Sequence, residues 1–600
     1  MKMLFKILAA LLILSLSLCV FVSCERKEAQ GSSSVMTQSE TSDTMQEQNK
    51  EPGTPDKTPN TNASKPAIDK TPNSSSSPEA QAYEKGFPIT KQKMTLKIMG
   101  MSLPSRGDAE MMSQFKYYEK ITNIKTVYVG VEEPRYLERI ALAIQSGDLP
   151  DVITARQFSD SEMIKYTLGK DKLFVEVGSY LEKWAPNIQK VLDSSTVIKG
   201  VNIAHDGKIY TLPSMRNTNT NYGHWLNIRK DWLDALDLEI PKTPEEFFDV
   251  MRAFRDRDPN GNGKKDEIAY GIYTWTADLI TAWWGVQSTK GRIGIDRDRK
   301  VYYPHATENA RAAVKFWHEF YEEEGLMWDK TGYMGGWNHL PGLIEQGNLG
   351  CFAYSYMSSK VYTPELLEKY IAIPFPSANF KNSEINVSKT ANPFYDIPSR
   401  GNVVITKACK NVEAALRYFD YYYTADGVML GNWGSPESGN YKKNKDGTYS
   451  ITNAKLLSED ADYQNAMGWA MGIAEMSRVY PNLVIRENYV NPDANPAYEK
   501  YQKEAIKTYT KAHKENPTYY LPNLQLTAEE VAVLRKYEKA NFMTSHNTIR
   551  HYVTGYKDIA EFDKIVAQWK NDGLDDYLAI YQRIVNRNKD YILDTKTYAK

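Results

Sequence analysis

Residues 135–155, RYLERIALAIQSGDLPDVITA, contain a helical pattern that stops at a glycine and is followed directly by an apolar strand pattern. The apolar residues of the first part recur at helical spacing, and Gly147 predicts the end of the helix. The following PDVITA predicts a buried strand. Upstream, MTLKIMG at 94–100 and KTVYVGV at 125–131 predict two more strands, with a helical pattern between them. Strands that alternate with helices predict a parallel sheet covered on both faces, and therefore an α/β fold.

The segments around this stretch follow a recognisable order. SGDLPDVI at 146–153 is followed by LFVEVGSYLEKWAPNIQKVL at 173–192 and DGKIYTLPS at 206–214. In order and spacing these segments resemble the first lobe of an extracellular solute-binding lipoprotein of a carbohydrate-type ABC importer. WLNIRKDWLDALDLEIPKTPEEFFDVMRAF at 225–254 is similar to a further segment of that family. With later blocks, the resemblance covers about residues 94–585.

The resemblance implies a two-lobe periplasmic-binding-protein-like fold of type II, with the ligand held in a cleft between lobes joined by chain crossovers. A body of roughly 510 residues also exceeds what one hydrophobic core supports. The expected division is a signal peptide at 1–23, a lipid-anchored disordered linker at 24–91, an N-terminal lobe at 92–216 and 395–435, and a C-terminal lobe at 217–394 and 436–600.

The amino terminus predicts export and anchoring. Two early lysines precede an apolar run at 7–22, and Ser23 stands directly before Cys24, which is typical of a signal peptide. The sequence Phe-Val-Ser-Cys resembles the lipobox of bacterial lipoproteins, which implies lipidation of Cys24; simple secretion is the alternative. The residues from Glu25 to about Lys91 are rich in Ser, Thr, Pro, Asn and charge, so they predict a disordered tether between membrane and body.

Composition excludes several classes of protein. A net charge of −1 argues against broad nucleic-acid binding. Four cysteines cannot form a disulfide framework once the signal peptide is removed and Cys24 is lipidated. Cys351 and Cys409 could form one bridge, but both lie in apolar strand-like contexts, which favours two buried free thiols.

The loop RDRDPNGNGKKDEI at 255–268 predicts a calcium site, because short oxygen-bearing side chains alternate there and glycines allow a sharp turn. A twelve-residue EF-hand register starting at Asp256 would put Lys264 at a ligand-like position, so the register starting at Asp258 is preferred. A solvated turn without metal is the alternative. The expected ligands are Asp258, Asn260, Asn262, the Lys264 carbonyl, Asp266 and Glu267. The loop resembles the calcium loop of alginate-oligosaccharide-binding family members, which implies a structural Ca²⁺ that fixes a helix end to the next strand.

Motifs for catalysis are weak. The chain has no G-x-S-x-G elbow and no P-loop, so a hydrolase of the α/β class and a nucleotide-driven reaction lose their usual support. A secreted glycoside hydrolase or polysaccharide lyase remains the main alternative, since it needs only two carboxylates that face a sugar cleft. A third class is a surface adhesin, which would have no deep cleft between lobes and no closure on ligand.

Most of the candidate ligand-binding residues follow from the rule that ligands bind beyond the carboxyl ends of strands. Asp396 is added because its carboxylate could accept hydrogen bonds from sugar hydroxyls. The chain has 41 Tyr and 12 Trp, and aromatic faces suit sugar rings, although core packing is an equal alternative for each Trp. Trp283 and Trp284 are adjacent on an expected helix, so one of them should face the core. Trp337 and Trp433 stand in loops flanked by glycine. The candidates are Arg106, Gln157, Arg216, Tyr222, Trp225, Trp275, Trp337, Asp396 and Trp433.

The family resemblance also implies partners and a mechanism. An oligosaccharide would bind the open form, the lobes would close about the crossovers, and the closed form would dock on permease subunits driven by a separate ATPase. The binding subunit itself is expected to be a monomer without catalytic residues, held at the outer face of the bacterial membrane. Arg106 and Arg216 would tolerate a carboxylate on the ligand.

Overall fold

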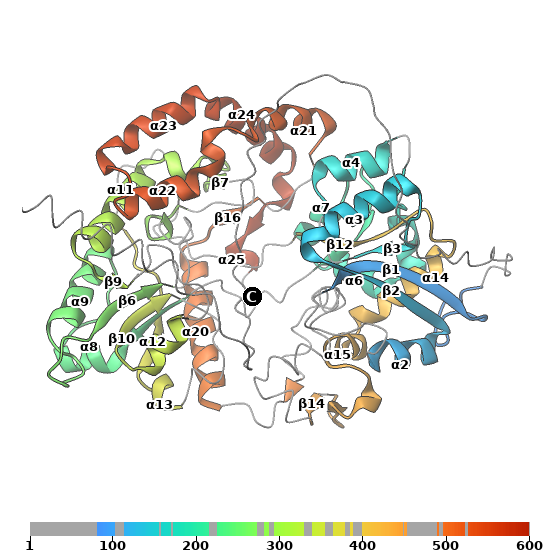
Figure 1. The fold of residues 1–600 in the computed structure, drawn as a ribbon, viewed down its shortest axis with the longest axis horizontal. Coiled ribbons are helices and arrows are strands. Elements are labelled where there is room, and N and C mark those ends of the chain that lie inside the picture. The colour runs from blue at the N-terminus through green and yellow to red at the C-terminus, as the bar shows by residue number, and fades with distance from the viewer. Residues whose placement is uncertain are drawn as a thin grey trace, which may run out of the picture. The chain divides into compact units, whose positions relative to one another are not determined.

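Two five-stranded sheets organise the body of the protein, and each lies in its own lobe of the ribbon in Figure 1. The computed structural model describes residues 81–102, 113–154, 158–169, 172–214, 225–272, 281–286, 293–328, 339–353, 364–378, 385–387, 399–447, 449–452, 489–490, 496–521 and 526–598. Residues 76–600 form one unit by their contacts. Among the described residues, none of the helices has the length and apolar character needed to cross a bilayer, and the apolar run at 7–22 lies outside them.

The first sheet has the strand order β2-β1-β3-β12-β4. Its strands are β1 (Met94–Ser102), β2 (Ile124–Glu132), β3 (Val152–Ile153), β4 (Thr211–Ser214) and β12 (Ser399–Ile405). β1 pairs with β2 and β3 in parallel, as the sequence predicted. β12 comes from much later in the chain and is antiparallel to both β3 and β4, so the sheet is mixed rather than purely parallel.

Helices cover both faces of the first sheet (Figure 1). On one face, Tyr136 and Met163 pack against Ile153, and on the other face Tyr118 packs with Leu96. The helices of this lobe are α2 (Ser113–Thr122), α3 (Glu133–Ser146), α4 (Asp160–Leu168), α5 (Gly178–Trp184), α6 (Pro186–Asp193), α7 (Thr196–Asn202), α14 (Val412–Asp420) and α15 (Ala425–Trp433). α3 ends at Gly147, as the sequence pattern predicted, and the φ of 73° there is a left-handed conformation that glycine adopts readily.

The second sheet has the order β11-β5-β10-β6-β9 and is formed by β5 (Leu226–Arg229), β6 (Ile268–Ile272), β9 (Met327–Trp328), β10 (Leu349–Ala353) and β11 (Tyr370–Ile373). Aromatic rings dominate its core: Phe247 lies 4.8 Å from Trp283, and Trp283 lies 4.9 Å from Trp317, measured between ring centroids. The sequence predicted that one of Trp283 and Trp284 faces the core, and both are buried there, in the short 3-10 helix η3 (Ala282–Trp284).

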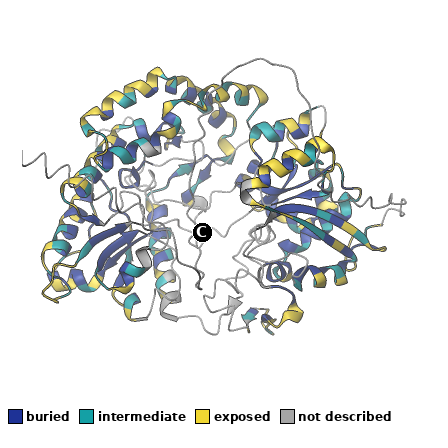
Figure 2. Ribbon diagram, viewed as in Figure 1, coloured by how far each residue is buried: buried dark blue, intermediate teal, exposed yellow. Residues whose placement is uncertain are grey.

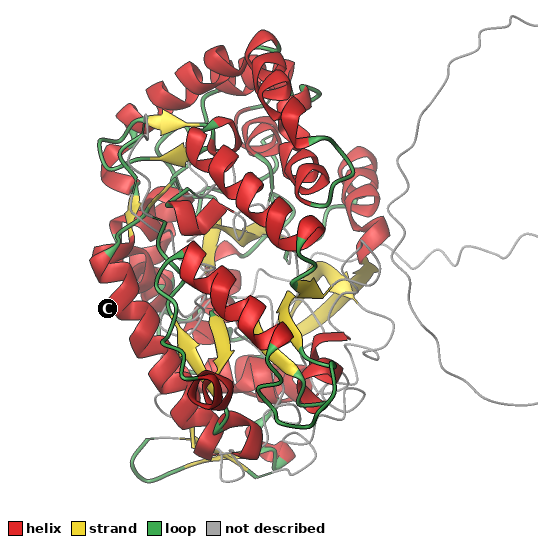
Figure 3. Ribbon diagram, turned by 90° about the vertical axis from the view of Figure 1, so that its left-hand side faces the viewer, coloured by secondary structure: helices red, strands yellow, loops and turns green. Residues whose placement is uncertain are grey.

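Helices surround the second sheet, as Figure 3 shows from the side of this lobe. α9 begins after Thr243, whose side chain accepts a hydrogen bond from the Glu246 backbone N–H at 3.2 Å. This is the N-cap expected of a threonine placed before a proline-led helix. The helices are α8 (Lys230–Leu236), α9 (Pro244–Asp256), α11 (Glu308–His318), the π-helix η5 (Glu319–Glu323), α12 (His339–Glu345), α13 (Pro364–Leu367) and α20 (Pro496–Glu515).

The carboxyl-terminal region adds a layer of helices to the second lobe. Its helices pack on a small sheet of order β17-β16-β7-β8 around the buried Trp569. The elements are β7 (Gly294–Ile295), β8 (Val301–Tyr302), η4 (Pro304–Ala306), β16 (Tyr519–Tyr520), α21 (Ala528–Leu534), η9 (Arg535–Tyr537), η10 (Asn541–Thr544), α22 (Ser545–Val553), η11 (Ile559–Glu561), α23 (Phe562–Asn571), α24 (Leu574–Arg587), η12 (Lys589–Tyr591), β17 (Leu593–Asp594) and α25 (Thr595–Tyr598). Figure 2 shows buried strands in both lobes and exposed residues on the outer helix faces.

A third small sheet, β13 (Tyr441–Lys443), β14 (Tyr449–Ile451) and β15 (Tyr489–Val490), follows α15 and the turns η7 (Tyr421–Tyr423) and η8 (Pro436–Ser438). Lys443 and Tyr449 both bind the Asp426 carboxylate of α15, at 3.0 Å and 2.6 Å. Glu437 pairs with Lys120 of α2 at 2.7 Å. The described residues just beyond 435 therefore contact the first lobe, and the boundaries given from the sequence stay predictions.

Residues 81–91, which the sequence assigned to the linker, are folded against the first lobe. Ala82 pairs with Thr90, and Ile89 is fully buried. Cys351 and Cys409 are free and buried in different lobes, which confirms the expectation of two free thiols. Burial raises the pKa of Cys409 to about 12 and also raises that of Cys351, so neither thiol has the thiolate character or the exposure that reactivity requires.

Candidate functional site

At one edge of the first sheet lie the strand ends that the candidate ligand residues follow or precede in the sequence. β1, β3 and β4 are parallel to one another, and β12 is antiparallel to β3 and β4. The carboxyl ends of β1 and β4 therefore lie at the same edge as the amino end of β12, and Ser214 is paired with Ser399 there. Of the candidates, Arg106, Gln157, Arg216 and Asp396 lie within a few residues of this edge along the chain, but outside the described residues.

One edge of the second sheet is also flanked in the sequence by candidate ligand residues. β6, β9 and β10 are parallel, and β5 runs against β10, so Leu226 at the start of β5 is paired with Ala353 at the end of β10. Tyr222 and Trp225 precede β5, and Trp275 and Trp337 follow β6 and β9. Tyr222, Trp275 and Trp337 lie outside the described residues.

Two crossovers join these edges. The chain leaves the first edge after Ser214 and reaches the second at Leu226, and it leaves the second after Ile373 and returns to the first at Ser399. Both connections therefore run between the two edges that carry the candidate residues. This connectivity is what a ligand cleft flanked by a hinge requires.

Trp225 is buried, with 2% of its surface exposed, and packs in the core of the second lobe with its ring 6.3 Å from that of Tyr509. Its indole Nε1 has no hydrogen-bond partner. In this structure Trp225 is therefore a core residue, which was the alternative to a role in ligand binding. Trp433 is the last residue of α15 rather than part of a loop, because the helix continues to the C-cap Gly434; its side chain lies outside the described residues.

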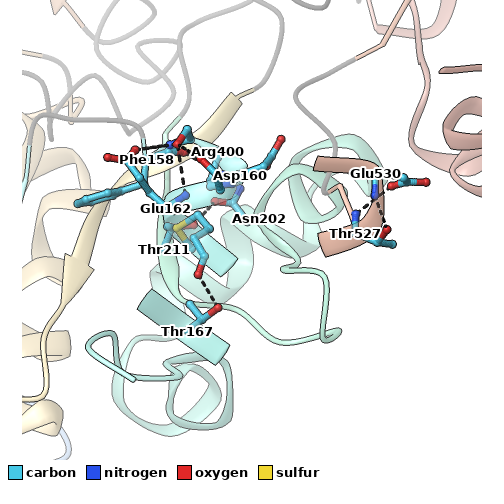
Figure 4. A network of polar contacts seen from close by, with 12 residues as sticks. Phe158, Asp160, Glu162, Thr167, Asn202, Thr211, Arg400, Thr527 and Glu530 are labelled. Atoms are coloured by element: carbon cyan, nitrogen blue, oxygen red, sulfur yellow. Dashed lines mark hydrogen bonds and ion pairs between the residues drawn. The ribbon is translucent and has the colours of Figure 1, made fainter. Parts of the chain in front are cut away.

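The first edge is held by a buried arginine that sequence reasoning missed. Arg400 of β12 is 1% exposed, its Nη1 donates to the Phe158 carbonyl at 2.9 Å, and its Nη2 pairs with the Asp160 carboxylate (Figure 4). Burial raises the pKa of Asp160, while the charge of Arg400 opposes that rise. The pair connects the returning crossover strand to the start of α4, 240 residues earlier.

Close packing behind Arg400 fixes the same strand. A Cβ on Gly401 would lie 1.5 Å from the Leu212 carbonyl oxygen, so only glycine fits where β12 approaches β4. The Asn202 Oδ1 accepts hydrogen bonds from the Gly401 N–H and the Thr211 hydroxyl, both at 3.0 Å (Figure 4). Two buried oxygens near this edge, Oδ1 of Asn402 and Oγ1 of Thr154, have no hydrogen-bond partner.

One helix of the second lobe lies near the hydrogen bonds of Arg400 and Asp160. α21 lies beside α4, and its N-cap Thr527 forms a capping box with Glu530 (Figure 4). The negative charge of Glu530 also acts on Asp160. Arg587 neutralises Glu530 through two hydrogen bonds, at 2.6 Å and 2.9 Å. Each carboxylate at this contact therefore has an arginine from its own lobe.

The predicted calcium loop joins α9 to β6. Asp258, Gly261 and Gly263 all have positive φ, of 47°, 68° and 73°, as a tight loop with inward-turned oxygens requires. The Asp258 carboxylate accepts hydrogen bonds from the backbone N–H groups of Asn262 and Gly263, at 3.1 Å and 2.9 Å. The Asn262 amide donates to Asp266 at 3.0 Å.

Glu267 is the clearest sign that the loop fits a cation. Its Oε1 is buried and has no hydrogen-bond partner. Burial, and then the charges of Asp266 and Asp258, raise its pKa. A divalent cation would satisfy that oxygen and relieve the repulsion among the carboxylates. Asp256, by contrast, has both oxygens bound to Arg255, at 2.7 Å and 2.8 Å, which favours the register that starts at Asp258.

The carboxylates do not yet converge on one point. Among the described residues, no group of three or more His, Cys, Asp or Glu side chains is close enough to hold a metal ion. The expected ligand set relies in addition on two asparagines and the Lys264 carbonyl.

Comparison with known proteins identifies the class. The model of the bacterial extracellular solute-binding protein family matches residues 103–429, more than half of the chain, and the chain belongs to this family. It is 27% identical over 524 residues to the fructooligosaccharide ABC transporter substrate-binding protein FusA of Streptococcus pneumoniae serotype 4, an alignment that covers 85% of this chain and 93% of FusA. That relative is described as a binding protein of a transporter, not as an enzyme.

Solved structures confirm the two-lobe fold. FusA in complex with kestose matches with a TM-score of 0.64 at 22% identity, covering 82% of this chain and 99% of FusA, and an EF-hand mutant of FusA in complex with fructo-nystose matches with 0.63. An HMO binding protein from Bifidobacterium longum infantis gives a TM-score of 0.66 at 19% identity, covering 82% and 98%. The alginate-binding protein AlgQ2 without calcium ion gives 0.58 at 22% identity, covering 82% and 98%.

Proposed function

We propose that the chain is the substrate-binding subunit of an ABC importer and that it captures an oligosaccharide between its two lobes. The similarity to FusA, which extends over nearly the whole length of both chains, carries this proposal. The strand ends add support, because polar and aromatic candidates from both lobes arise at the two edges that the crossovers join.

Ligand capture would follow from this geometry. Aromatic candidates of the second edge, Trp275 and Trp337, would stack on sugar rings, and polar candidates of the first edge, such as Arg106 and Asp396, would bind hydroxyl groups. Arg400 and Gly401 would hold β12 in a fixed position while the crossovers rotate. Closure must be favoured by tighter binding of the sugar to the closed form than to the open form.

The proposed function includes a cellular location and partner proteins. The chain is lipidated at Cys24 and held at the outer face of the cell membrane, and its body is a monomer that docks on permease subunits driven by a separate ATPase. It catalyses no reaction on the sugar. Labelled palmitate incorporated by the native chain, but not by Cys24→Ser, tests the anchor.

Calcium belongs to the same proposal. The loop Asp258–Glu267 binds one Ca²⁺ through Asp258, Asn260, Asn262, the Lys264 carbonyl, Asp266 and Glu267. The unpartnered Oε1 of Glu267 supports this assignment. The ion would fix the end of α9 to the start of β6 and need not touch the sugar.

Thermal unfolding against a panel of sugars tests the function. The panel contains kestose, nystose, maltotriose, and oligomers of alginate and galacturonate, and each mixture is also assayed for new reducing ends. A ligand of the native state must raise the midpoint by mass action. Stabilisation by one sugar class without release of reducing ends is expected. Release of reducing ends would overturn the binding-protein proposal, and an unchanged midpoint with every sugar would overturn the choice of oligosaccharide as ligand.

A further inference from the structure

A short hairpin stands where the described chain begins. Ala82 and Thr90 form an antiparallel bridge, the Tyr83 N–H donates to the Ile89 carbonyl at 2.8 Å, and the Lys91 N–H donates to the Gln81 carbonyl at 3.1 Å. The turn between these partners includes Gly86, with φ 73°. We call residues 81–93 the N-terminal hairpin.

The hairpin is fixed to the first lobe. Arg417 of α14 donates to the carbonyl of Tyr83 and, at 2.9 Å, to that of Gly86. The Phe87 ring meets Tyr421 edge to face with centroids 5.3 Å apart, and the Ile89 N–H donates to the Thr122 carbonyl at 3.0 Å. These contacts hold the turn and leave the side chains of Tyr83 and Phe87 partly exposed.

The side chains that remain outside are aromatic and basic. Tyr83 is 42% exposed and Phe87 is 47% exposed. The exposed lysines Lys85, Lys91 and Lys93 stand against a single acidic residue of the hairpin, Glu84.

Neighbouring helices add to the same character. Lys183 of α5 lies 2.8 Å from Glu84 and also over the ring of Trp184, at 4.8 Å. Lys93 pairs with Glu119 of α2 at 2.6 Å. The acidic groups of the hairpin and its contacts are thus each matched by a lysine, and Lys85 and Lys91 remain as additional positive charge.

This combination suits the interface of an anionic bilayer. Aromatic side chains with an apolar body settle at the level of lipid headgroups, and lysines near an anionic surface add attraction.

The position of the hairpin points the same way. Its amino end continues in the sequence toward Cys24, the proposed site of the lipid, which stands 57 residues before Gln81. The hairpin precedes Met94, at the amino end of β1, whereas the edge that carries ligand candidates lies at the carboxyl end, about 30 Å away along the strand. A surface so tethered needs only weak intrinsic affinity.

We propose that the tip of the N-terminal hairpin, formed by Tyr83, Lys85 and Phe87, is a membrane-contact surface that rests the first lobe on anionic lipid. This inference rests on the proposed anchor for its biological setting. It leaves the candidate ligand edge turned away from the bilayer.

The test uses residues 24–600 with Cys24→Ser, so that no acyl chain contributes. Binding is measured by sedimentation with vesicles of phosphatidylcholine, with and without phosphatidylglycerol. Binding only to the anionic vesicles is expected, and Tyr83→Ser with Phe87→Ser, or Lys85→Gln with Lys91→Gln, should each weaken it about tenfold. The matched control is Leu137→Ser with Leu142→Ser on α3, which removes two side chains that are 55% and 47% exposed and should change nothing.

Depth of insertion gives a second readout that does not depend on variant stability. Because Cys351 and Cys409 are buried, Lys85→Cys can be labelled with an environment-sensitive fluorophore, and Leu142→Cys serves as the control. Brominated lipid should quench the label at position 85 and not the label at 142.

Three results would overturn the proposal. They are equal binding to neutral vesicles, equal losses in the hairpin and α3 variants, and binding to soluble poly(glycerol phosphate) that the aromatic variants do not weaken. The last would assign the patch to a cell-wall polyanion. Since the protein under test lacks Cys24, none of these results bears on the anchor, which the palmitate experiment tests separately.

Discussion

Each of the two large sheets buries an arginine among its described residues, and the two arginines are bound in different ways. Arg229 of β5 binds Asp231, two residues away, through Nε and Nη2 at 2.6 Å each, and its Nη1 donates to the Gly347 carbonyl at 2.6 Å. Its guanidinium also stacks over Trp232 at 4.6 Å. Arg400 of β12 instead binds Asp160, 240 residues away, and its Nε has no partner.

The difference shows how the two lobes are held. The side chain of Asp231 is 41% exposed and can be hydrated without its arginine, whereas that of Asp160 is only 17% exposed and is hydrated much less. Arg229 is therefore a local packing element in an aromatic core. Arg400 is a long-range connection that keeps a crossover strand against α4, at the edge where ligand candidates arise.

The largest expected effect is that of Arg400→Met, because it leaves the Asp160 carboxylate, whose side chain is only 17% exposed, without its cation. We expect a loss of about 3–5 kcal/mol in the free energy of unfolding. Urea unfolding, with hydrogen exchange followed on β12 and β6, measures the loss and locates it in the first lobe. Asp160→Asn in the same chain should recover at least about 1 kcal/mol. Equal exchange on both strands, or no recovery, would contradict the long-range connection.

Calcium removal should destabilise the second lobe, because it too leaves carboxylates without a cation. At a hundredfold excess over its dissociation constant the ion contributes about 2.7 kcal/mol, and EDTA should remove that contribution with faster exchange on β6 but not on β12. Glu267→Gln should abolish the response to calcium. Asp256→Asn is the matched control, because Arg255 occupies both oxygens of Asp256, and it should respond as the native protein does. A lost response in Asp256→Asn would instead favour the EF-hand register.

A buried histidine provides a pH test in the second lobe. Burial lowers the pKa of His513 in α20 to about 3, while an unfolded histidine has a pKa of about 6.5. The stability that comes from keeping this side chain neutral is complete above pH 6.5 and is lost as the pH falls toward 3. Between pH 7 and pH 5 the loss is about 2 kcal/mol. His513→Gln should remove this part of the pH dependence, measured by urea unfolding, and an unchanged dependence would show that other groups carry it.

Arg229→Met should have the smallest effect of these, about 1–2 kcal/mol, from the lost hydrogen bond to Gly347 and the lost stacking on Trp232. The same urea experiment as for Arg400→Met gives the ratio of the two losses. If the Arg229 variant loses as much free energy of unfolding as the Arg400 variant, the different exposure of Asp231 and Asp160 does not explain how the two arginines act.

Local features of the fold were predictable from the sequence, because they depend on neighbouring residues. The strand at 94–100, the helix end at Gly147 and the Thr243 cap all follow from spacing or from the conformation that one residue type allows. The oxygen-rich loop at 255–268 was predictable for the same reason.

Features that depend on distant residues were not predictable in this way. Nothing in the spacing of SRGNVVI indicates that β12 enters the middle of the first sheet in the antiparallel sense, or that Arg400 meets Asp160. Trp225 was proposed as a ligand residue because it lies in the segment that follows the strand IYTLP, but tertiary packing decides whether a tryptophan is covered. The N-terminal hairpin was not predicted because the residues before it are polar, although the apolar sequence FPI at 87–89 indicated the folded end of this segment.

The central position of β12 has a consequence for the order of folding. All strands of the second sheet lie between residues 226 and 373, whereas the first sheet lacks the strand that joins β3 to β4 until residues 399–405 have been made. A chain that emerges amino terminus first therefore exposes β4 without a neighbour while the second sheet already has every strand that it needs. The sheet that is begun first is therefore completed last, and until β12 has been made the edges of β3 and β4 that it will join remain open to pairing with other chains.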